Sequence, residues 1–411
     1  MGPRPSAAEC ELPAGTGEGS VIYGWGANRG TQLGFPPPPA QHVTPTPAGT
    51  AGSPFSFPAA PVAVAAGEVH SLALLEDGSV WGWGGNGDGQ AGREMGDPVA
   101  AWIPRRVGAL EGVRRIAAGR FHSLAVTDDG ALWGWGARSA LEISGMYAEG
   151  NTAQPVRVAA PGPVADAAAG DGFSLAAMEN GTVWALGSGS WGRLGPGDRR
   201  VNHSRVGGLY GIATVAVGRI HAVALRTDGA VLTWGGNWSG QLGLDVRVDE
   251  YPRCSPEPCR ATPLVVPGLP RIAAIAAGEM HTVAAAEDGG VWEWGLEGVT
   301  YGQAGVGVTW PAPRVVATPE TIGRVVQVAA GQKFSLALGS DGTVWWWGHH
   351  PALHPQFFPV LAEPLDSAVP VALPGAPRAG AMWIAAGSYH GLLISRADGR
   401  TCAPAAQPGE P

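Results

Sequence analysis

The chain has 411 residues, including 65 glycines, 37 prolines and 17 tryptophans, and hydrophobic residues make up 45% of it. The formal net charge is −8 and Lys333 is the only lysine, which argues against a basic face that binds nucleic acid. No stretch of about 18 apolar residues is present, so we expect no transmembrane helix and no membrane insertion.

The first segment with a strand pattern is VIYGWGANRGTQLG at 21–34, which resembles only the end of the units that follow it. Residues 1–20 lack the apolar core of a signal peptide, so we predict a flexible N-terminal tail. We therefore expect the protein in the cytoplasm, or outside the cell if a leader is missing from this chain.

A repeated unit begins with the pattern A-x-G-x-x-H/F, and successive copies are 48 to 60 residues apart. The repeat glycines are Gly67, Gly119, Gly170, Gly218, Gly278, Gly331 and Gly387. Each copy is followed by an Asp-Gly or Asn-Gly pair between apolar runs. Such a pair predicts a two-residue hairpin turn in which both residues take positive φ. In the first unit the predicted strands are 70–75 and 79–83.

The second strand of each hairpin ends in W-G or a variant, as in WGWG at 81–84. Because a strand alternates its faces, Trp81 and Trp83 share one face and the two glycines share the other, which suits sheets stacked face to face. Alanine-rich segments such as RRIAAG predict an inner strand near the axis of a ring. Proline-containing segments such as IPRRV, TPLVV and APRVV predict an outer edge strand.

A period near 50 residues with several short strands per unit is typical of a β-propeller. The last unit, at 383–399, lacks a W-G strand. Residues 21–26 would supply it as the final strand of the last blade, which closes the ring and covers two sheet edges. We therefore predict an all-β, seven-bladed propeller with four-stranded blades over 21–402, a flexible tail over 403–411, and a monomer.

The segments AAGEVHSLALLEDGSVWGWGGNGDGQAG (65–92) and LTWGGNWSGQLG (232–243) resemble repeats of the regulator of chromosome condensation family. The resemblance covers about residues 20–400 and implies a seven-bladed β-propeller closed by its N-terminal strand. Two tails, at 135–144 and 347–356, lack the family's G-Q-L-G ending, so we expect irregular loops there.

The resemblance does not select one function, because members include guanine-nucleotide exchange factors, a plant UV-B photoreceptor and a bacterial inhibitor of β-lactamases. The photoreceptor's sensing tryptophans lie in a G-W-R-H-T motif. No unit here has tryptophan in the two positions after the repeat glycine, so we do not expect light sensing.

Two residues that vary from unit to unit lie between each repeat glycine and the His or Phe three positions later. Positions that the fold required would repeat, so we predict that these pairs form a partner-binding rim. The first member alternates in sign over five units, which predicts a salt-bridged ring. The second is often large and apolar, which predicts interface anchors unless these side chains pack between blades. The predicted residues are Glu68, Val69, Arg120, Phe121, Asp171, Arg219, Ile220, Glu279, Met280, Lys333 and Tyr389.

The histidine of the repeat is present in five units and replaced by Phe173 and Phe334 in the other two. Phe cannot bind a metal and metal sites need clustered ligands, so we interpret the position as structural and predict no metal or other cofactor. The five histidines are His70, His122, His221, His281 and His390.

Four cysteines are present, and none forms a C-x-x-C motif. Cys254 and Cys259, in RCSPEPCR, predict two thiols or a local disulfide rather than a zinc site, because no histidine lies near them. Cys10 and Cys402 would be brought together by ring closure, and would form a disulfide only in an oxidising compartment.

The predicted function is a non-catalytic module, not an enzyme, that binds a protein partner of unknown identity through one rim. The alternative is an inhibitor or regulator of an enzyme, which includes guanine-nucleotide exchange on a small GTPase. The segment 244–263, in the longest interval between repeats, could be a binding insertion. Two carboxylates converging with a histidine in the central funnel would instead favour an enzyme.

Overall fold

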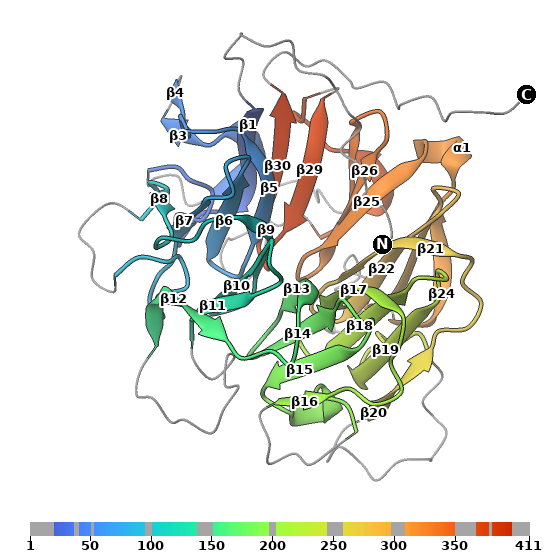
Figure 1. The fold of residues 1–411 in the computed structure, drawn as a ribbon. Helices are drawn as coiled ribbons and strands as arrows, with labels where there is room; N and C mark the ends of the chain where they lie inside the picture. Colours follow the sequence, from blue (N-terminus) through green and yellow to red (C-terminus); the bar gives the residue numbers. More distant parts are fainter. Residues whose placement is uncertain are drawn as a thin grey trace, which may run out of the picture.

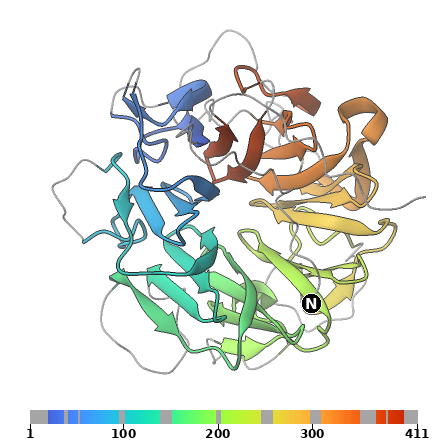
Figure 2. The ribbon, with the colours of Figure 1, turned by 45° about the horizontal axis from the view of Figure 1, so that its top comes forward.

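The computed structural model describes residues 20–36, 41–50, 53–94, 101–137, 151–196, 203–244, 258–296, 309–349, 367–377 and 380–396. The described residues form seven four-stranded antiparallel sheets, arranged as blades in a ring (Figure 1, Figure 2). This architecture confirms the predicted all-β, seven-bladed propeller. Most of the predicted tails, 1–20 and 403–411, and of the two predicted irregular loops lie outside the described residues.

The blades follow one another along the chain, and each runs from an inner to an outer strand. Blade one contains β5 (Pro61–Ala66), β6 (His70–Leu75), β7 (Val80–Gly84) and β8 (Arg105–Arg106). Blade two contains β9 (Val113–Ala118), β10 (His122–Thr127), β11 (Leu132–Gly136) and β12 (Thr152–Val158). Blade three contains β13 (Val164–Ala169), β14 (Phe173–Met178), β15 (Val183–Gly187) and β16 (His203–Arg205). Blade four contains β17 (Ile212–Val217), β18 (His221–Arg226), β19 (Val231–Gly236) and β20 (Cys259–Val265).

Blade five contains β21 (Ile272–Ala277), β22 (His281–Ala286), β23 (Val291–Leu296) and β24 (Thr309–Ala317). Blade six contains β25 (Val325–Ala330), β26 (Phe334–Gly339), β27 (Val344–Gly348) and β28 (Ser367–Ala372). Blade seven contains β29 (Ala381–Ala386), β30 (His390–Arg396), β1 (Ser20–Ala27) and β2 (Gln41–Pro47). A small hairpin of β3 (Gly49–Thr50) and β4 (Ser53–Pro54), the short helix α1 (Pro319–Ile322) and a 3-10 turn at Ser190–Gly192 complete the described elements.

Blade seven joins the two ends of the described chain. β1 pairs antiparallel with β30, with Gly24 opposite Leu392, and the two strands lie side by side in Figure 1. Closure of the ring by the N-terminal strand is therefore confirmed. β1 is not the final strand of this blade, however, because β2 pairs with its other side. The sequence pattern did not identify β2, in which prolines interrupt the apolar alternation.

The hairpin turns differ from the predicted type. In blade one the backbone N–H of Gly78 donates to the carbonyl of Leu75 at 3.0 Å, and only the glycine has positive φ, +76°. No Asp or Asn of the six described Asp-Gly or Asn-Gly turns has positive φ, so the two-residue prediction is wrong. The loop has three residues, a type I turn followed by a left-handed glycine. Asp77 accepts a hydrogen bond from the backbone N–H of Ser79 at 2.9 Å, which explains the acidic residue.

Seven hydrophobic clusters lie between neighbouring blades, one for each of the seven blade pairs. Trp83 and Trp81 belong to the cluster between blades seven and one, as expected for side chains on one face of β7. On the other face a Cβ at Gly82 would clash with the backbone carbonyl of Ala91. The glycine thus leaves room for the tail of its own blade, while the tryptophans fill the space to the preceding blade.

In several W-G strands the tryptophan directly before the W-G glycine is also hydrogen-bonded to the preceding blade. Trp83 Nε1 donates to the carbonyl of Gln32 at 2.9 Å. The same bond joins Trp135 to Gln90, Trp294 to Gln241 and Trp234 to Arg193. These bonds fix each blade against the tail of its neighbour, so the ring positions the loops at its mouth.

Candidate functional site

The loops that join the two inner strands of each blade meet at one mouth of the central funnel. They surround a cavity of about 360 Å³, and the first residue after each repeat glycine lines it. These seven residues are Glu68, Arg120, Asp171, Arg219, Glu279, Gln332 and Ser388. The structure therefore brings together residues that are more than 300 positions apart in the sequence.

The repeat glycines form the wall behind these side chains. A Cβ at Gly119 would lie 2.6 Å from the carbonyl oxygen of Gly170, in the next blade, and 2.7 Å from the ring of His122. Each of the other six repeat glycines also faces the carbonyl of the next one around the closed ring. The backbones approach too closely for any side chain, which explains why glycine recurs at this position.

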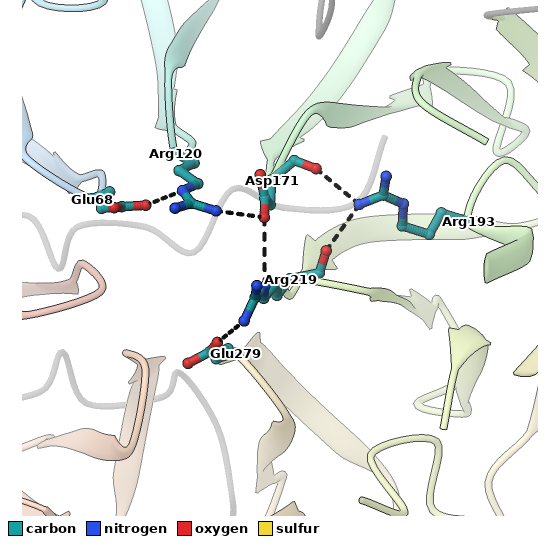
Figure 3. A network of polar contacts seen from close by, with 6 residues as sticks. All are labelled: Glu68, Arg120, Asp171, Arg193, Arg219 and Glu279. Carbon is teal, nitrogen blue, oxygen red and sulfur yellow. Dashed lines mark hydrogen bonds and ion pairs between the residues drawn. The ribbon is translucent and has the colours of Figure 1, made fainter. Parts of the chain in front are cut away.

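The five charged first residues form a continuous network of ion pairs across blades one to five (Figure 3). Arg120 pairs with Glu68 on one side and with Asp171 on the other, the latter at 3.1 Å. Arg219 pairs with Asp171 at 3.6 Å and with Glu279. We call Glu68, Arg120, Asp171, Arg219 and Glu279 the rim network. Its charges alternate as the sequence pattern predicts, but the ion pairs span five of the seven blades and do not close into a ring.

The carboxylates of the network are more buried than its arginines. The side chains of Glu68 and Glu279 are 18% and 16% exposed, against 37% for Arg120 and 47% for Arg219. Burial raises the pKa of Glu68, and the nearby Arg120 opposes this rise. The arginines therefore offer most of the network's accessible charge to a partner.

The second residues of the pairs are held by their backbones. The carbonyl of Val69 accepts a hydrogen bond from Gly85 N–H at 2.6 Å, and the six other carbonyls make the equivalent bond. The side chains of Val69, Phe121, Met280, Lys333 and Tyr389 are partly buried. Ile220 is only 1% exposed and packs toward Gly236, so it offers no surface to a partner.

Arg193 is a residue of this region that sequence reasoning missed. It stands where other tails have the glutamine of G-Q-L-G, and it is only 3% exposed. Its Nη1 donates to the carbonyls of Asp171 at 2.8 Å and Arg219 at 3.0 Å (Figure 3). Its guanidinium lies 4.5 Å from the ring centroid of Phe173, and burial lowers its pKa to about 10. The substitution of Gln by Arg in the repeat was the signal that could have identified it.

The five histidines lie in a buried ring behind the rim and bond to the next blade. His70 Nε2 lies 2.9 Å from Ser123 Oγ, and that hydroxyl donates its own hydrogen to the carbonyl of Gln90. The histidine is therefore the donor of the bond to Ser123. The corresponding pairs are His122–Ser174, His221–Thr282, His281–Ser335 and His390–Ser71.

The two phenylalanines at the histidine position follow the same rule. Ala222 occupies the hydroxyl position after Phe173, and Gly391 occupies it after Phe334. A hydroxyl is thus present wherever a histidine needs an acceptor and absent wherever a phenylalanine replaces the histidine. This pairing accounts for the position as a structural one. Burial lowers the pKa of His70 to about 3 and that of His122 to about 4, so both are neutral near pH 7.

No histidine is among the described residues that line the mouth of the funnel. The three carboxylates of the rim network are ion-paired with arginines, and the histidines lie behind the glycine wall. Within the same ranges, no group of three or more His, Cys, Asp or Glu side chains could hold a metal ion. No described helix is long and apolar enough to cross a membrane.

Only one of the four cysteines, Cys259, lies among the described residues, and it is disulfide-bonded. Cys10, Cys254 and Cys402 lie outside those residues. The predicted proximity of Cys10 and Cys402 therefore stays a prediction. The candidate insertion at 244–263 lies mostly outside the described residues as well.

Comparison with protein families and curated proteins places this geometry among known propellers. The RCC1-like domain family matches residues 21–350. The chain is 32% identical over 255 residues to the ultraviolet-B receptor UVR8 of Arabidopsis thaliana. The aligned region covers 59% of this chain and 54% of that protein. It is 33% identical over 303 residues to the E3 ubiquitin-protein ligase HERC2 of Homo sapiens, covering 71% of this chain and 6% of that protein. The chain therefore spans about half of the first relative and a small part of the second.

Solved structures show the same fold at lower sequence identity. Prp20p from Saccharomyces cerevisiae superposes with a TM-score of 0.76 at 22% identity, over 93% of this chain and 92% of that one. Human WBSCR16 superposes with a TM-score of 0.75 at 20% identity, over 92% of this chain and 99% of that one. At these identities the likeness establishes the fold alone.

Proposed function

The chain belongs to the RCC1-like domain family, which confirms the resemblance seen in its repeats, and we propose that it is a non-catalytic module that binds a protein partner. The solved structure of Prp20p is described together with that protein's binding to Gsp1p and histones. UVR8 is a receptor and HERC2 a ubiquitin ligase. One fold hosts these different roles, so the binding surface must be argued from this chain's own residues.

The observation that carries the proposal is the rim network. It is built from positions that the repeat leaves free to vary, yet five of them pair in sequence around one mouth. The fold does not require a charge at this position, because blades six and seven have Gln332 and Ser388 there. A fixed arrangement of charges around a cavity orients a partner and excludes partners with the wrong charges.

The proposed docking surface combines the rim network with the partly buried side chains beside it. Phe121 lies under the guanidinium of Arg120, with 4.8 Å between Arg120 Cζ and the ring centroid. Val69, Met280, Lys333 and Tyr389 complete the surface. Ile220 is left out because it is buried. Rigid aromatic and arginine side chains of this kind dominate the binding energy of many protein interfaces.

A pull-down from the source organism, followed by mass spectrometry, tests the proposal with matched variants. Arg219→Ala removes the most exposed charge of the network and is expected to weaken capture of the partner. Arg226→Ala is the control, because Arg226 is also ion-paired, with Asp228, but at the opposite end of β18. Loss of capture in both variants, or in neither, would contradict binding through this rim.

The alternative role, an inhibitor or regulator of an enzyme that includes a small GTPase, uses the same surface. It predicts that the captured partner is an enzyme and that the wild-type chain, but not Arg219→Ala, changes its rate. We further propose that the chain is a monomer, that residues 21–402 form one domain, and that nucleic acid and membranes are not its partners. Localisation in the cytoplasm is also a proposal, with a location outside the cell as its alternative. The redox state of Cys259 in cells tests it, because a disulfide that persists there would favour the oxidising environment outside the cell.

A further inference from the structure

The rim network is an open arc, not a closed ring. Blades one to five supply its charges, whereas blades six and seven supply Gln332, Ser388 and Tyr389 to the same cavity. Both ends of the arc are carboxylates, Glu68 and Glu279, and each pairs with one arginine (Figure 3). The cavity lining thus has three carboxylates and two guanidinium groups, a net charge of −1.

The two terminal carboxylates, at opposite ends of the arc, influence the pKa of the same neighbouring groups. The negative charges of Asp171 and Glu279 both add to the upward shift of the Glu68 pKa, whose largest cause is burial. Burial is also the largest cause of the raised pKa of Tyr389, and the charges of Glu68 and Glu279 raise it further. The charges of Glu68 and Glu279 therefore act together at Tyr389, where Arg120 and the hydrogen bond with Gln332 oppose them.

A third acceptor lies in the gap of the arc, by which we mean the part of the rim that blades six and seven supply. Gln332 lines the cavity and its side chain is hydrogen-bonded to Tyr389, while its Oε1 is shielded from solvent and has no partner of its own among the described residues. An unpaired buried acceptor destabilises the folded state, and a donor that enters the cavity would remove this cost. Glu68, Glu279 and Gln332 thus line one cavity of about 360 Å³ and supply three acceptors to it.

We propose that this gap receives a lysine side chain of the protein partner. An ammonium group has three donors and no acceptor, which matches three acceptors and one missing positive charge. At about 30 Å³ per water molecule, the cavity holds a lysine side chain with several waters. The inference rests on the proposed docking of a partner at this rim and specifies the chemistry of the group that enters the funnel.

Small cations test the gap without knowledge of the partner. Binding of n-butylammonium to the full chain is measured by saturation-transfer NMR, with n-butanol and n-butylguanidinium as comparison ligands. The wild-type chain is expected to bind butylammonium more tightly than either. Glu68→Gln and Glu279→Gln are each expected to weaken binding about fivefold, as the loss of one charge pair would. Glu287→Gln is the control, because Glu287 pairs with Arg271 outside the cavity.

A second variant keeps the test decisive if the glutamine variants disturb the network. Gln332→Lys places an ammonium group in the gap from within the chain, and is expected to abolish butylammonium binding while the melting temperature stays the same or rises. Unchanged probe binding in Gln332→Lys, or equal binding of butanol, would overturn the proposal. Tighter binding of butylguanidinium would overturn the assignment to lysine. None of these outcomes bears on partner capture, which the Arg219→Ala pull-down tests separately.

Discussion

Glu293 in β23 accepts a hydrogen bond from the indole Nε1 of Trp347, in the next blade, at 3.1 Å. In four other blades the corresponding tryptophan donates to a backbone carbonyl of the preceding tail. Glu293 also accepts from Ser335 Oγ at 3.2 Å and pairs with Arg314 at 3.2 Å. A buried carboxylate thus takes the place of the carbonyl that the other blades use.

We predict that Glu293→Leu strongly destabilises the propeller. Leucine would leave the buried donors of Trp347 and Ser335 unpaired and Arg314 without its carboxylate. Breaking a buried pair of this kind costs about 3–5 kcal/mol. Glu293→Gln keeps an acceptor oxygen and is expected to cost about 1 kcal/mol. Thermal unfolding followed by circular dichroism measures both, and equal losses for the two variants would refute the role of the acceptor.

The fold could be predicted from the sequence because its determinants repeat. Seven copies of the glycine, the turn and the W-G strand gave the period, the blade count and the closing strand. β2 was missed because its pairing depends on β1 and not on an alternating pattern. The turn type was assigned wrongly because an Asp-Gly pair fits both a two-residue and a three-residue loop, and only the backbone geometry separates them.

The site was predicted less completely because part of it deviates from the repeat. The alternating charges of the rim are visible in the sequence once the copies are aligned. Arg193 and Glu293 are single replacements, of a tail glutamine and of a strand glycine, and their roles depend on contacts with neighbouring blades. The exposure of the apolar residues also required coordinates, since Ile220 is buried whereas Phe121 is not.

We predict that Gly119→Ala destabilises the ring by at least about 2 kcal/mol, because the added Cβ would lie 2.6 Å from the carbonyl oxygen of Gly170. The neighbouring atom is backbone and cannot move without shifting the next blade. Gly87→Ala is the matched control, since nothing lies within 4 Å of a Cβ there. Urea unfolding measures both variants, and similar midpoints would contradict the account of the glycine wall.

We predict that acid destabilises the protein through its buried histidines. Burial lowers the pKa of His70, His221 and His390 to about 3 and that of His122 and His281 to about 4, from 6.5. Below pH 6.5 the unfolded chain binds protons that the folded chain does not. Stability is therefore fully present above pH 6.5 and falls as the pH drops toward 4, by about 1 kcal/mol per pH unit for each histidine.

The double variant His70→Phe/Ser123→Ala tests this cause, because it copies the natural pair Phe173 and Ala222. It is expected to fold and to lose about one fifth of the acid sensitivity, measured as the difference in urea midpoint between pH 7.5 and pH 5. His70→Phe alone leaves Ser123 without its donor and should be less stable at both values. An acid sensitivity identical to that of the wild type would exclude His70 as a source.

Ring closure gives the last prediction. Deleting residues 1–27 removes β1, which lies between β30 and β2. β2 then loses its neighbour in the sheet, β30 keeps only β29, and Trp25 leaves the cluster between blades six and seven. Removing a buried tryptophan alone costs about 3–5 kcal/mol, so we expect a large fall in melting temperature. A deletion of residues 1–17 serves as the control because it leaves β1 intact. A synthetic peptide of residues 18–36 added to the shorter chain should restore part of the loss by pairing with β30. If the two deletions melt alike, or if the peptide has no effect on the longer deletion, β1 does not hold the ring closed.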